Sequence, residues 1–354
     1  MPLLLDTARS CAAVELRGAN CMTIGLVNNM PDAACEATER QFLDLIRKAT
    51  SNAVVHFKLF SIAAVPRADH VRQELAARYR DISELWNMRL DGLIVTGTEP
   101  RAANLKDEPY WATLAKLVDW ARQNTVSTVW SCLAAHAAVL HADGIARRPL
   151  REKKFGVFDC EVASIHPLTT GMKPRLFVPH SRYNDLPERA LAAGGYRLLT
   201  QSTAAGADAF VREERGGSLF VFFQGHPEYE TDTLAREYRR DVGCFLRGKQ
   251  EHYPAAPEGY FNDAATALVN DFRARAVGDR RASLMADFPF AALEPALENT
   301  WRRSATDIYE NWIVYLKDRK AKRRTPAMVP ARRSRRDARR IGGLRPAADR
   351  RSTG

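Results

Sequence analysis

Short apolar runs alternate with longer segments of helical periodicity along most of the chain. Five runs rich in β-branched and aromatic residues each end in small or polar residues. They cover positions 22–27, 54–60, 90–95, 126–130 and 219–223. The intervening segments at 36–49 and 110–123 carry apolar side chains at helical spacing. This alternation predicts an α/β fold with a mostly parallel sheet flanked by helices. Ligands of such sheets bind beyond the carboxyl ends of the strands, where the polar and reactive residues of this chain fall.

The net charge of +11 is not spread evenly over the 354 residues. Residues 317–354 hold fifteen Lys and Arg and three Asp, a net charge of +12, so residues 1–316 carry −1. Apolar periodicity also stops there, so we predict a basic disordered tail at 317–354. We further expect an N-terminal extension at 1–20 and one α/β domain at 21–316, with an added helical segment at about 262–300. The basic charge therefore describes the tail and does not indicate nucleic-acid binding by the folded part.

The cysteine pattern and the N-terminus indicate where the protein works. The six cysteines are scattered, with no C-x-x-C pair of the kind found in zinc ribbons and redox motifs. The apolar run at the N-terminus is too short for a signal peptide, and no stretch of eighteen apolar residues predicts a membrane span. These features favour a reducing cytoplasm, where a free thiol stays reactive.

Cys132 lies where a predicted strand gives way to a helix of small residues, in the segment TVWSCLAAHAAVL at 128–140. Small residues permit the tight strand-to-helix turn that exposes a nucleophile. The amides at a helix N-terminus also lower the pKa of a thiol placed there. Taken alone, the segment favours an inert cysteine in an Ala-rich core helix. His136, four residues further on, is interpreted as a packed core histidine rather than a catalytic base.

His226 and Glu228 follow the last predicted strand, in the segment FFQGHPEY at 222–229. A histidine at a strand end with a carboxylate two residues later suits a base and the group that orients it. Pro227 stiffens the turn because its ring fixes the backbone and prevents helix continuation. Combined with a cysteine at a neighbouring strand end, the pair predicts a Cys-His-Glu arrangement for nucleophilic catalysis.

A third polar segment, VPHSRYN at 178–184, includes Ser181. Its side chains could bind a carboxylate or an ammonium group, although the segment by itself favours an ordinary solvated loop. Lys153 and Arg240 lie in other charged segments, and by themselves are typical of surface charges.

Taken in chain order, these segments resemble the homoserine O-succinyltransferase family (homoserine transacylases). The resemblance covers most of residues 22–316. The matching stretches are 90–97 (LDGLIVTG), 110–111, the turn at 132, 152–153, 156–157, 179–183 (PHSRY), 225–229 (GHPEY), 240–242, 301–302 and 311–312. The family's fold is similar to that of class I glutamine amidotransferases, so the resemblance implies a flavodoxin-like three-layer sandwich.

The resemblance also implies a ping-pong acyl transfer in methionine biosynthesis. Cys132 would attack an acyl-CoA thioester and release coenzyme A. His226, oriented by Glu228, would then deprotonate the γ-hydroxyl of homoserine, which attacks the acyl-cysteine. Acyl-CoA is a co-substrate, and no metal or permanently bound cofactor is implied. We also expect a homodimer.

Further residues match family positions near the substrates. The residues that match substrate-contacting positions of the family are Lys153, Ser181 and Arg240. The backbone N–H of Leu133 is expected to stabilise the oxyanion, with a second donor from the loop at Gly97 and Thr98.

Two positions depart from the family pattern. Arg101 occupies the position that separates succinyl from acetyl donors, where the family usually has Gly or Glu. An arginine can pair with the succinyl carboxylate, whereas acetyl offers it nothing, so we predict succinyl-CoA as donor. Asp32 and Ala33 stand where lysines are expected, which leaves part of the donor or acceptor recognition open.

Other functions remain open from the sequence. A glutaminase of the amidotransferase type also uses Cys, His and Glu, but glycines usually flank its nucleophile, and here Ser131 and Leu133 do so. Acetyl-CoA as donor, or acyl transfer to another hydroxyl amino acid such as serine, is a closer alternative. A catalytically silent protein that binds nucleic acid or an acidic partner through its arginine-rich tail belongs to a different class.

Overall fold

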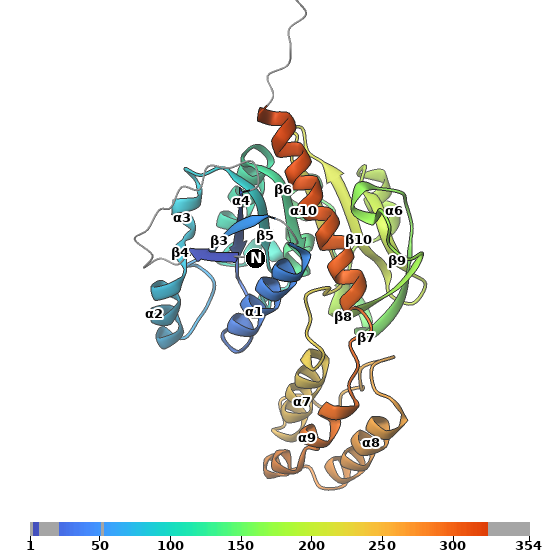
Figure 1. The fold of residues 1–354 in the computed structure, drawn as a ribbon. Coiled ribbons are helices and arrows are strands. Elements are labelled where there is room, and N and C mark those ends of the chain that lie inside the picture. Colours follow the sequence, from blue (N-terminus) through green and yellow to red (C-terminus); the bar gives the residue numbers. More distant parts are fainter. Residues whose placement is uncertain (1–2, 7–20, 51–52, 325–354) are drawn as a thin grey trace, which may run out of the picture.

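The computed structural model describes residues 3–6, 21–50 and 53–324. They form an eleven-stranded sheet with helices packed on it (Figure 1). The strands are β1 (Leu3–Asp6), β2 (Cys21–Val27), β3 (Val54–Ser61), β4 (Arg80–Asp81), β5 (Leu90–Val95), β6 (Thr125–Ser131), β7 (Arg148–Val162), β8 (Arg175–Asp185), β9 (Arg197–Ser202), β10 (Gly206–Glu213) and β11 (Leu219–Phe223). The five predicted strands are present as β2, β3, β5, β6 and β11, which confirms the predicted α/β class.

The sheet has a parallel half and an antiparallel half. Strands β1-β3-β2-β5-β6-β11 lie side by side in parallel, with the short β4 beside β3, whereas β11-β10-β9-β7-β8 pair antiparallel. The predicted mostly parallel sheet is therefore confirmed for the half that contains the predicted strands. At the centre, Phe223 of β11 pairs with Ser131 of β6 at the carboxyl ends of both strands. The segments that follow these strands carry Cys132 and His226, so the two residues are brought to the same edge of the sheet.

Helices cover both faces of the sheet. The larger ones are α1 (Asp32–Ala49) and α10 (Arg302–Arg324) on one face, and α4 (Trp111–Asn124) and α5 (Leu133–Asp143) on the other. Trp312 of α10 crosses Gly92 of β5 so closely that a Cβ there would lie 2.8 Å from its ring. The Trp312 indole also donates to Ser127 Oγ at 2.9 Å. Apolar side chains thus join both helical layers to the sheet, as the predicted three-layer sandwich requires.

Shorter helices lie at the margins of the sheet. They are α2 (Asp69–Arg78), α3 (Ile82–Leu85) and α6 (Glu188–Ala193). No helix among residues 3–6, 21–50 and 53–324 is long and apolar enough to cross a membrane.

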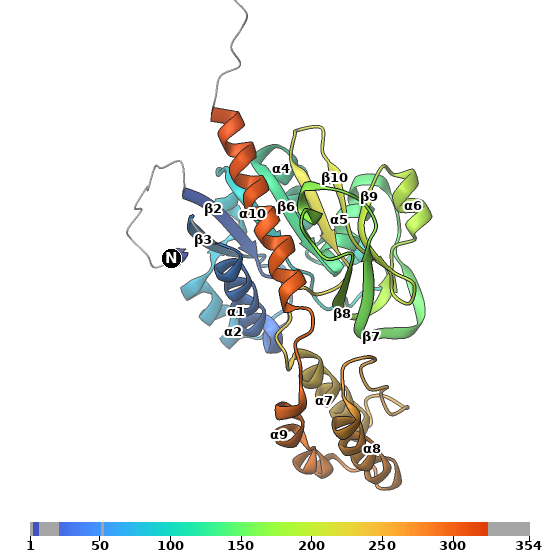
Figure 2. The same cartoon turned by 45° about the vertical axis from the view of Figure 1, so that its right-hand side comes forward.

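A helical lobe projects from the sheet, as Figure 1 and Figure 2 show from two directions. It contains α7 (Thr233–Leu246), α8 (Asp263–Gly278) and α9 (Phe290–Leu293), which share an apolar core that includes Tyr238 and Phe272. The chain returns to the sheet through Trp301, whose indole donates to Tyr229 O at 2.9 Å. The helical segment expected at 262–300 forms part of this lobe, but α7 precedes it and belongs to the same core.

Two predicted boundaries are wrong. Leu3–Asp6 of the expected extension forms β1, which pairs with β3, and Asp6 forms ion pairs with Lys58 and Arg80. At the other end, α10 continues through 317–324, where the disordered tail was expected to begin. Lys and Arg are good helix formers, and Lys320 is held by Asp91 at 2.6 Å. Residues 7–20 and 325–354 lie outside the described part of the chain.

Candidate active site

Cys132 forms a sharp turn between β6 and α5. Its backbone has φ 52° and ψ −115°, and among the described residues it is the one non-glycine with a positive φ. Its N–H donates to Phe223 O at 2.8 Å, which ties the turn to the end of β11. A side chain in this region of backbone space is strained, and such strain is concentrated at functional sites. The strand-to-helix turn expected for an exposed nucleophile is therefore present at the predicted residue, whose side chain is half-buried.

His226 and Glu228 form a buried pair beside this turn. The His226 Nδ1 lies 2.8 Å from Glu228 Oε1, and the His226 N–H donates to Pro179 O at 2.8 Å. Both side chains are almost fully buried. The ring of Tyr229 stacks on the imidazole, with 4.3 Å between the ring centroids. The imidazole is thus held on one side by a carboxylate and on one face by an aromatic ring.

The charges around His226 favour its protonated form. Burial lowers the pKa of His226, but the charges of Glu228 and of a Cys132 thiolate, with hydrogen bonding to both, raise it well above its ordinary value. The second oxygen of Glu228 has no hydrogen-bond partner among the described residues. Glu228 therefore carries a buried charge whose direct partner is the imidazole, as expected of a group that orients a catalytic histidine.

His136 is a core histidine, as the sequence predicted. It is 3% exposed, and its Nε2 lies 2.9 Å from Gln224 Oε1. Burial lowers the pKa of His136 to about 4, so its ring is neutral near pH 7.

The segment at 178–184 is part of strand β8, so its interpretation as a loop is wrong. A hydrophobicity pattern misses this strand because several of its residues are polar. These polar side chains are nevertheless buried beside polar partners. Arg182 donates to Asn184 O at 2.8 Å and to Asp185 Oδ1 at 3.0 Å, and it is 4% exposed. His180 is fully buried, with its Nε2 3.4 Å from Asp208 Oδ1.

The three predicted substrate-binding residues gather around two carboxylates of α7. Ser181 donates to Glu237. Lys153 Nζ donates to Asp241 Oδ2 at 2.8 Å and lies 3.9 Å from Glu237. Arg240 Nη2 lies 2.9 Å from Asp241 Oδ1. The structure therefore brings the three residues together, with cationic side chains and carboxylates in one cluster.

Glu237, Asp241 and Tyr229 were not singled out in the sequence. The Tyr229 hydroxyl donates to Glu237 Oε1 at 2.5 Å, which links the residue stacked on His226 to the Ser181 cluster. Glu237 and Asp241 are spaced four apart, so they share one face of a helix. The spacing indicates in the sequence that the two carboxylates share a helix face. It does not indicate which part of the protein that face of α7 contacts.

The loop expected to supply the second oxyanion donor packs against the start of α5. A Cβ on Gly97 would lie 2.6 Å from Leu133 Cβ and 2.9 Å from Leu133 N, so the 97–98 loop touches the start of α5. Among the described residues, neither the Leu133 N–H nor the Thr98 N–H donates a hydrogen bond. The Asn29 side chain fastens this loop to the end of β2 by donating to Thr96 O at 3.0 Å.

The two departures from the family pattern, Arg101 and Asp32, differ in their contacts. The backbone N–H of Arg101 donates to Glu108 Oε1 at 2.5 Å, while its side chain is exposed and has no ion pair with a described residue. Asp32 begins α1 and accepts hydrogen bonds from Ala68 N at 2.9 Å and from Arg67 at 3.3 Å. Asp32 thus serves to attach the segment at Arg67 rather than standing free.

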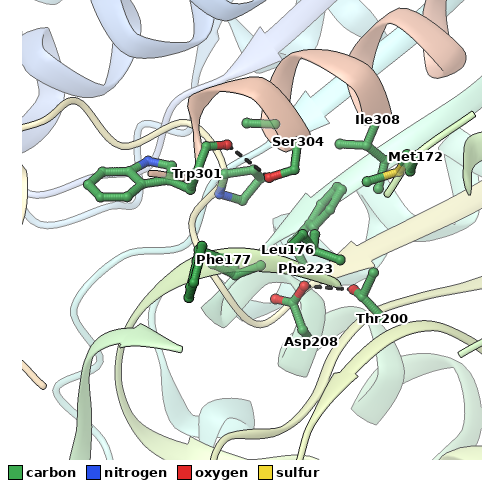
Figure 3. Close-up of a pocket in the computed structure, with 12 residues that line it drawn as sticks. Met172, Leu176, Phe177, Thr200, Asp208, Phe223, Trp301, Ser304 and Ile308 are labelled. Atoms are coloured by element: carbon green, nitrogen blue, oxygen red, sulfur yellow. Dashed lines mark hydrogen bonds between the residues drawn. The ribbon is translucent and has the colours of Figure 1, made fainter. Parts of the chain in front are cut away.

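A small apolar pocket lies behind the His226 turn, between the start of α10 and the strands β8 to β11 (Figure 3). Pro227 and Trp301 line it, as does Asp208, which accepts from Thr200 Oγ1 at 2.7 Å and from Gly225 N at 3.2 Å. Neither Cys132 nor the His226–Glu228 pair is part of its lining. The pocket therefore belongs to the packing that supports the turn.

Comparisons with known proteins agree on one family. The family model described as homoserine O-succinyltransferase matches residues 9–323. The chain is 49% identical over 300 residues to the homoserine O-succinyltransferase of Methylorubrum extorquens, covering 85% of this chain and 88% of that protein. It is 47% identical over 298 residues to the enzyme of the same name from Rhodopseudomonas palustris, covering 84% of this chain and 89% of that one.

Solved structures with this arrangement are more distant. A glutamine amido transferase from Methylobacillus flagellatus has a TM-score of 0.45 and 15% identity, over 84% of this chain and 95% of that one. The family assignment rests instead on the family model and on the sequence relatives, which cover most of the chain. The chain belongs to the homoserine O-succinyltransferase family.

Proposed function

We propose that the protein is a homoserine O-succinyltransferase of methionine biosynthesis. It transfers the succinyl group of succinyl-CoA to the γ-hydroxyl of L-homoserine through an acyl-cysteine. The observation that carries this proposal is the strained Cys132 turn at the end of β6 beside the buried His226–Glu228 pair. Names of relatives in the same family support the choice of substrates.

In the first half-reaction the Cys132 thiolate attacks the carbonyl carbon of the succinyl thioester. The carbonyl oxygen becomes an oxyanion, which the N–H groups of Leu133 and Thr98 stabilise. The bond to the sulfur of coenzyme A then breaks, and protonated His226 supplies the proton to the departing thiolate. A new thioester replaces the old one, so this step is nearly balanced in free energy.

In the second half-reaction His226 acts as a base. The charge of the Cys132 thiolate is one of the causes that raise the pKa of His226, and acylation removes that charge. Glu228 then remains to raise the pKa of His226 against the lowering effect of burial. The pKa of His226 therefore falls once the acyl group is in place. The neutral imidazole takes the proton of the homoserine hydroxyl, the oxygen attacks the acyl carbon, and Cys132 leaves as a thiolate.

The charged cluster on α7, β7 and β8 supplies the acceptor site. Arg240 offers a fork of donors for the homoserine carboxylate. Glu237 and Asp241 offer acceptors for its ammonium group, while Ser181 and Lys153 complete the cluster. Because these residues adjoin Tyr229, and Tyr229 stacks on His226, a bound amino acid has its side chain directed towards the base.

Donor selection is assigned in part to Arg101, whose exposed guanidinium is free to meet a carboxylate. The proposal also includes a cytoplasmic homodimer with acyl-CoA as co-substrate and no permanently bound cofactor.

Mass spectrometry of the full chain tests the proposed function. Incubation with succinyl-CoA is expected to add one succinyl group to the peptide that contains Cys132, and L-homoserine is expected to remove it. Acetyl-CoA and L-serine serve as the alternative donor and acceptor. Cys132→Ala removes the adduct, whereas Cys244→Ala, at a half-buried cysteine outside the site, retains it. An adduct that homoserine does not discharge, or a Cys132→Ala variant with full transferase activity, would contradict the proposal.

A further inference from the structure

An open pocket on the helical lobe is lined almost entirely by cations, and we call it the arginine pocket. Its volume is about 360 Å³, within the roughly 300 to 1,000 Å³ of small-molecule sites. Residues three and four apart share one face of a helix, so side chains at this spacing on α7 gather beside the pocket. The lining residues are Arg236, Arg239, Arg240, Gly243, Arg247 and Met285.

Two of the four arginines have no carboxylate partner. Arg236 and Arg240 each pair with a nearby aspartate, at 2.7 and 2.9 Å. Arg239 and Arg247 are exposed and form no ion pair with a described residue. The arginine pocket therefore has an excess of positive charge, which an anionic ligand can neutralise.

Gly243 allows one of these cations to lie against the helix. A Cβ at this position would be 3.0 Å from Arg247 Nη1 and 3.4 Å from Arg247 Nη2, so the guanidinium packs on the bare surface of α7. A glycine inside a helix is destabilising relative to alanine. Here the missing side chain leaves room for Arg247 to line the pocket.

Arg240 connects the arginine pocket with the acceptor cluster. It lines the pocket, and it pairs with Asp241, which also accepts from Lys153 at 2.8 Å. The same cluster reaches Tyr229, whose ring stacks on His226. A continuous series of contacts thus joins the pocket to the reaction centre.

We propose that the arginine pocket binds the phosphate groups of the coenzyme A donor while its thioester reaches Cys132. Of the two substrates of the proposed function, only the donor carries phosphates, a 3′-phosphate and a diphosphate on its adenosine. The pantetheine arm separates them from the sulfur, so they bind at a distance from the nucleophile. Guanidinium groups bind phosphate oxygens through paired, charge-assisted hydrogen bonds. The inference rests on the proposed function and assigns donor binding to Arg239 and Arg247.

Succinyl-N-acetylcysteamine separates the phosphates from the chemistry, because it has the succinyl thioester but no adenosine or phosphate. Combining Arg239→Ala with Arg247→Ala is expected to lower kcat/KM for succinyl-CoA about 10-fold, since each exposed charge pair contributes modestly. The same variant should keep kcat/KM for the truncated thioester within about twofold of the wild-type value. Combining Arg72→Ala with Arg303→Ala is the matched control. It removes two other exposed arginines outside the pocket and should change neither value.

Inhibition of the wild-type chain distinguishes coenzyme A from free phosphate as the source of the anion. Adenosine 3′,5′-bisphosphate is expected to inhibit transfer from succinyl-CoA and to leave transfer from the truncated thioester unchanged. If inorganic phosphate inhibits at a lower concentration than the bisphosphate does, the pocket is a site for free phosphate and the proposal is wrong.

The outcomes also separate this inference from the proposed function. If the wild-type chain transfers succinyl from neither thioester, the proposed function fails. If it uses succinyl-CoA and the variant lacking Arg239 and Arg247 keeps its kcat/KM, or loses it equally for both thioesters, only the arginine pocket is excluded. Should that variant not fold, the bisphosphate decides, because equal inhibition with both thioesters would overturn the proposal.

Discussion

At the scale of single residues, the proposed mechanism couples the charge of Cys132 to the proton on His226. A Cys132 thiolate and Glu228 together raise the pKa of His226 against its burial. In the proposed reaction the same side chain therefore holds a proton before acylation and releases it more readily afterwards. A change at Cys132 should be visible at His226 even when no substrate is present.

Cys132→Ala is expected to lower the pKa of His226, because it removes the thiolate charge and leaves Glu228 in place. The neutral imidazole should then appear at a lower pH in the variant than in the wild-type chain. NMR titration of the His226 ring measures this difference directly. Cys244→Ala provides the control, since it removes a thiol that is not part of the site. An unchanged or higher pKa in Cys132→Ala would show that the thiolate does not act on the histidine.

The residues that could be anticipated from sequence are those that follow strand ends. Cys132, His226 and Glu228 all come directly after apolar strands, so parallel pairing is enough to bring them together. Glu237 depends on which way α7 faces, which only the folded chain determines. Local patterns carry no information about such contacts, and this residue looks like an ordinary surface charge in the sequence.

At the scale of secondary-structure elements, the loop after β5 and the start of α5 fit together without space for a side chain. The absence of a Cβ at Gly97 allows the loop to touch Leu133. This close approach determines how the loop that carries Thr98 packs against the start of α5, so the proposed oxyanion site depends on a glycine that binds nothing itself.

Gly97→Ala is expected to lower kcat by about 10²- to 10³-fold, the effect of losing one oxyanion donor. The added Cβ would meet Leu133 at 2.6 Å and push the loop away from α5. Stopped-flow measurement of coenzyme A release on mixing with succinyl-CoA tests this, because the acylation step itself should slow. The matched control is Gly278→Ala in α8, where a Cβ has nothing within 4 Å. Acylation at the wild-type rate in Gly97→Ala would exclude this loop from the oxyanion site.

Strand β8 shows why the antiparallel half of the sheet was not predicted. Its sequence alternates poorly and is rich in polar residues, which is typical of a loop. In the structure Arg182 is buried and donates to Asp185, and His180 is buried with its Nε2 3.4 Å from Asp208 Oδ1. Strands of this kind are stabilised by tertiary polar contacts rather than by apolar alternation, so a pattern based on hydrophobicity cannot find them.

At the scale of the whole molecule, the candidate site is divided between the sheet and the helical lobe. Ser181 and Lys153 belong to the sheet, whereas Glu237 and Asp241 belong to α7. A short backbone bridge also joins the two parts: Val157 N donates to Glu258 O at 2.8 Å, and Glu258 N donates to Phe155 O at 2.9 Å. The proposed acceptor site is therefore complete only when the lobe is docked.

Gly156→Ala is expected to weaken this docking. A Cβ at Gly156 would lie 2.2 Å from Glu258 O, and the residue has φ 151°. We expect a loss of about 2 to 4 kcal/mol in the free energy of unfolding. The KM for homoserine should rise while the acyl-Cys132 adduct still forms, because Cys132 and His226 lie outside the lobe. Chemical denaturation and adduct formation are the measurements.

Gly171→Ala is the control for this prediction, because Gly171 also has a positive φ, 72°, but nothing lies within 4 Å of its Cβ position. Its variant should lose about 1 to 2 kcal/mol, the cost of a left-handed backbone for a residue with a Cβ, and keep the wild-type KM. Equal effects of the two substitutions on homoserine KM would contradict the role given to the bridge.

The overall charge pattern was a poor guide to the ends of the fold. Composition placed the end of the domain at residue 316, but α10 extends through its charged stretch because Lys320 and Arg319 reach Asp91 and Glu213. Likewise β1 joins the sheet edge through only four residues. The two ends of the folded part are stabilised by a few specific contacts, and the average composition of a segment does not reveal such contacts.

The charged cluster around Glu237 already satisfies itself in the absence of any ligand. Lys153 and Arg240 pair with Asp241, and Ser181 donates to Glu237. An amino-acid zwitterion brings one charge of each sign, so it can exchange with these partners without altering the total charge. Under the proposed function these partners stand in for the acceptor, and Lys153, Glu237 and Asp241 lose most of their exposure during folding rather than at each turnover.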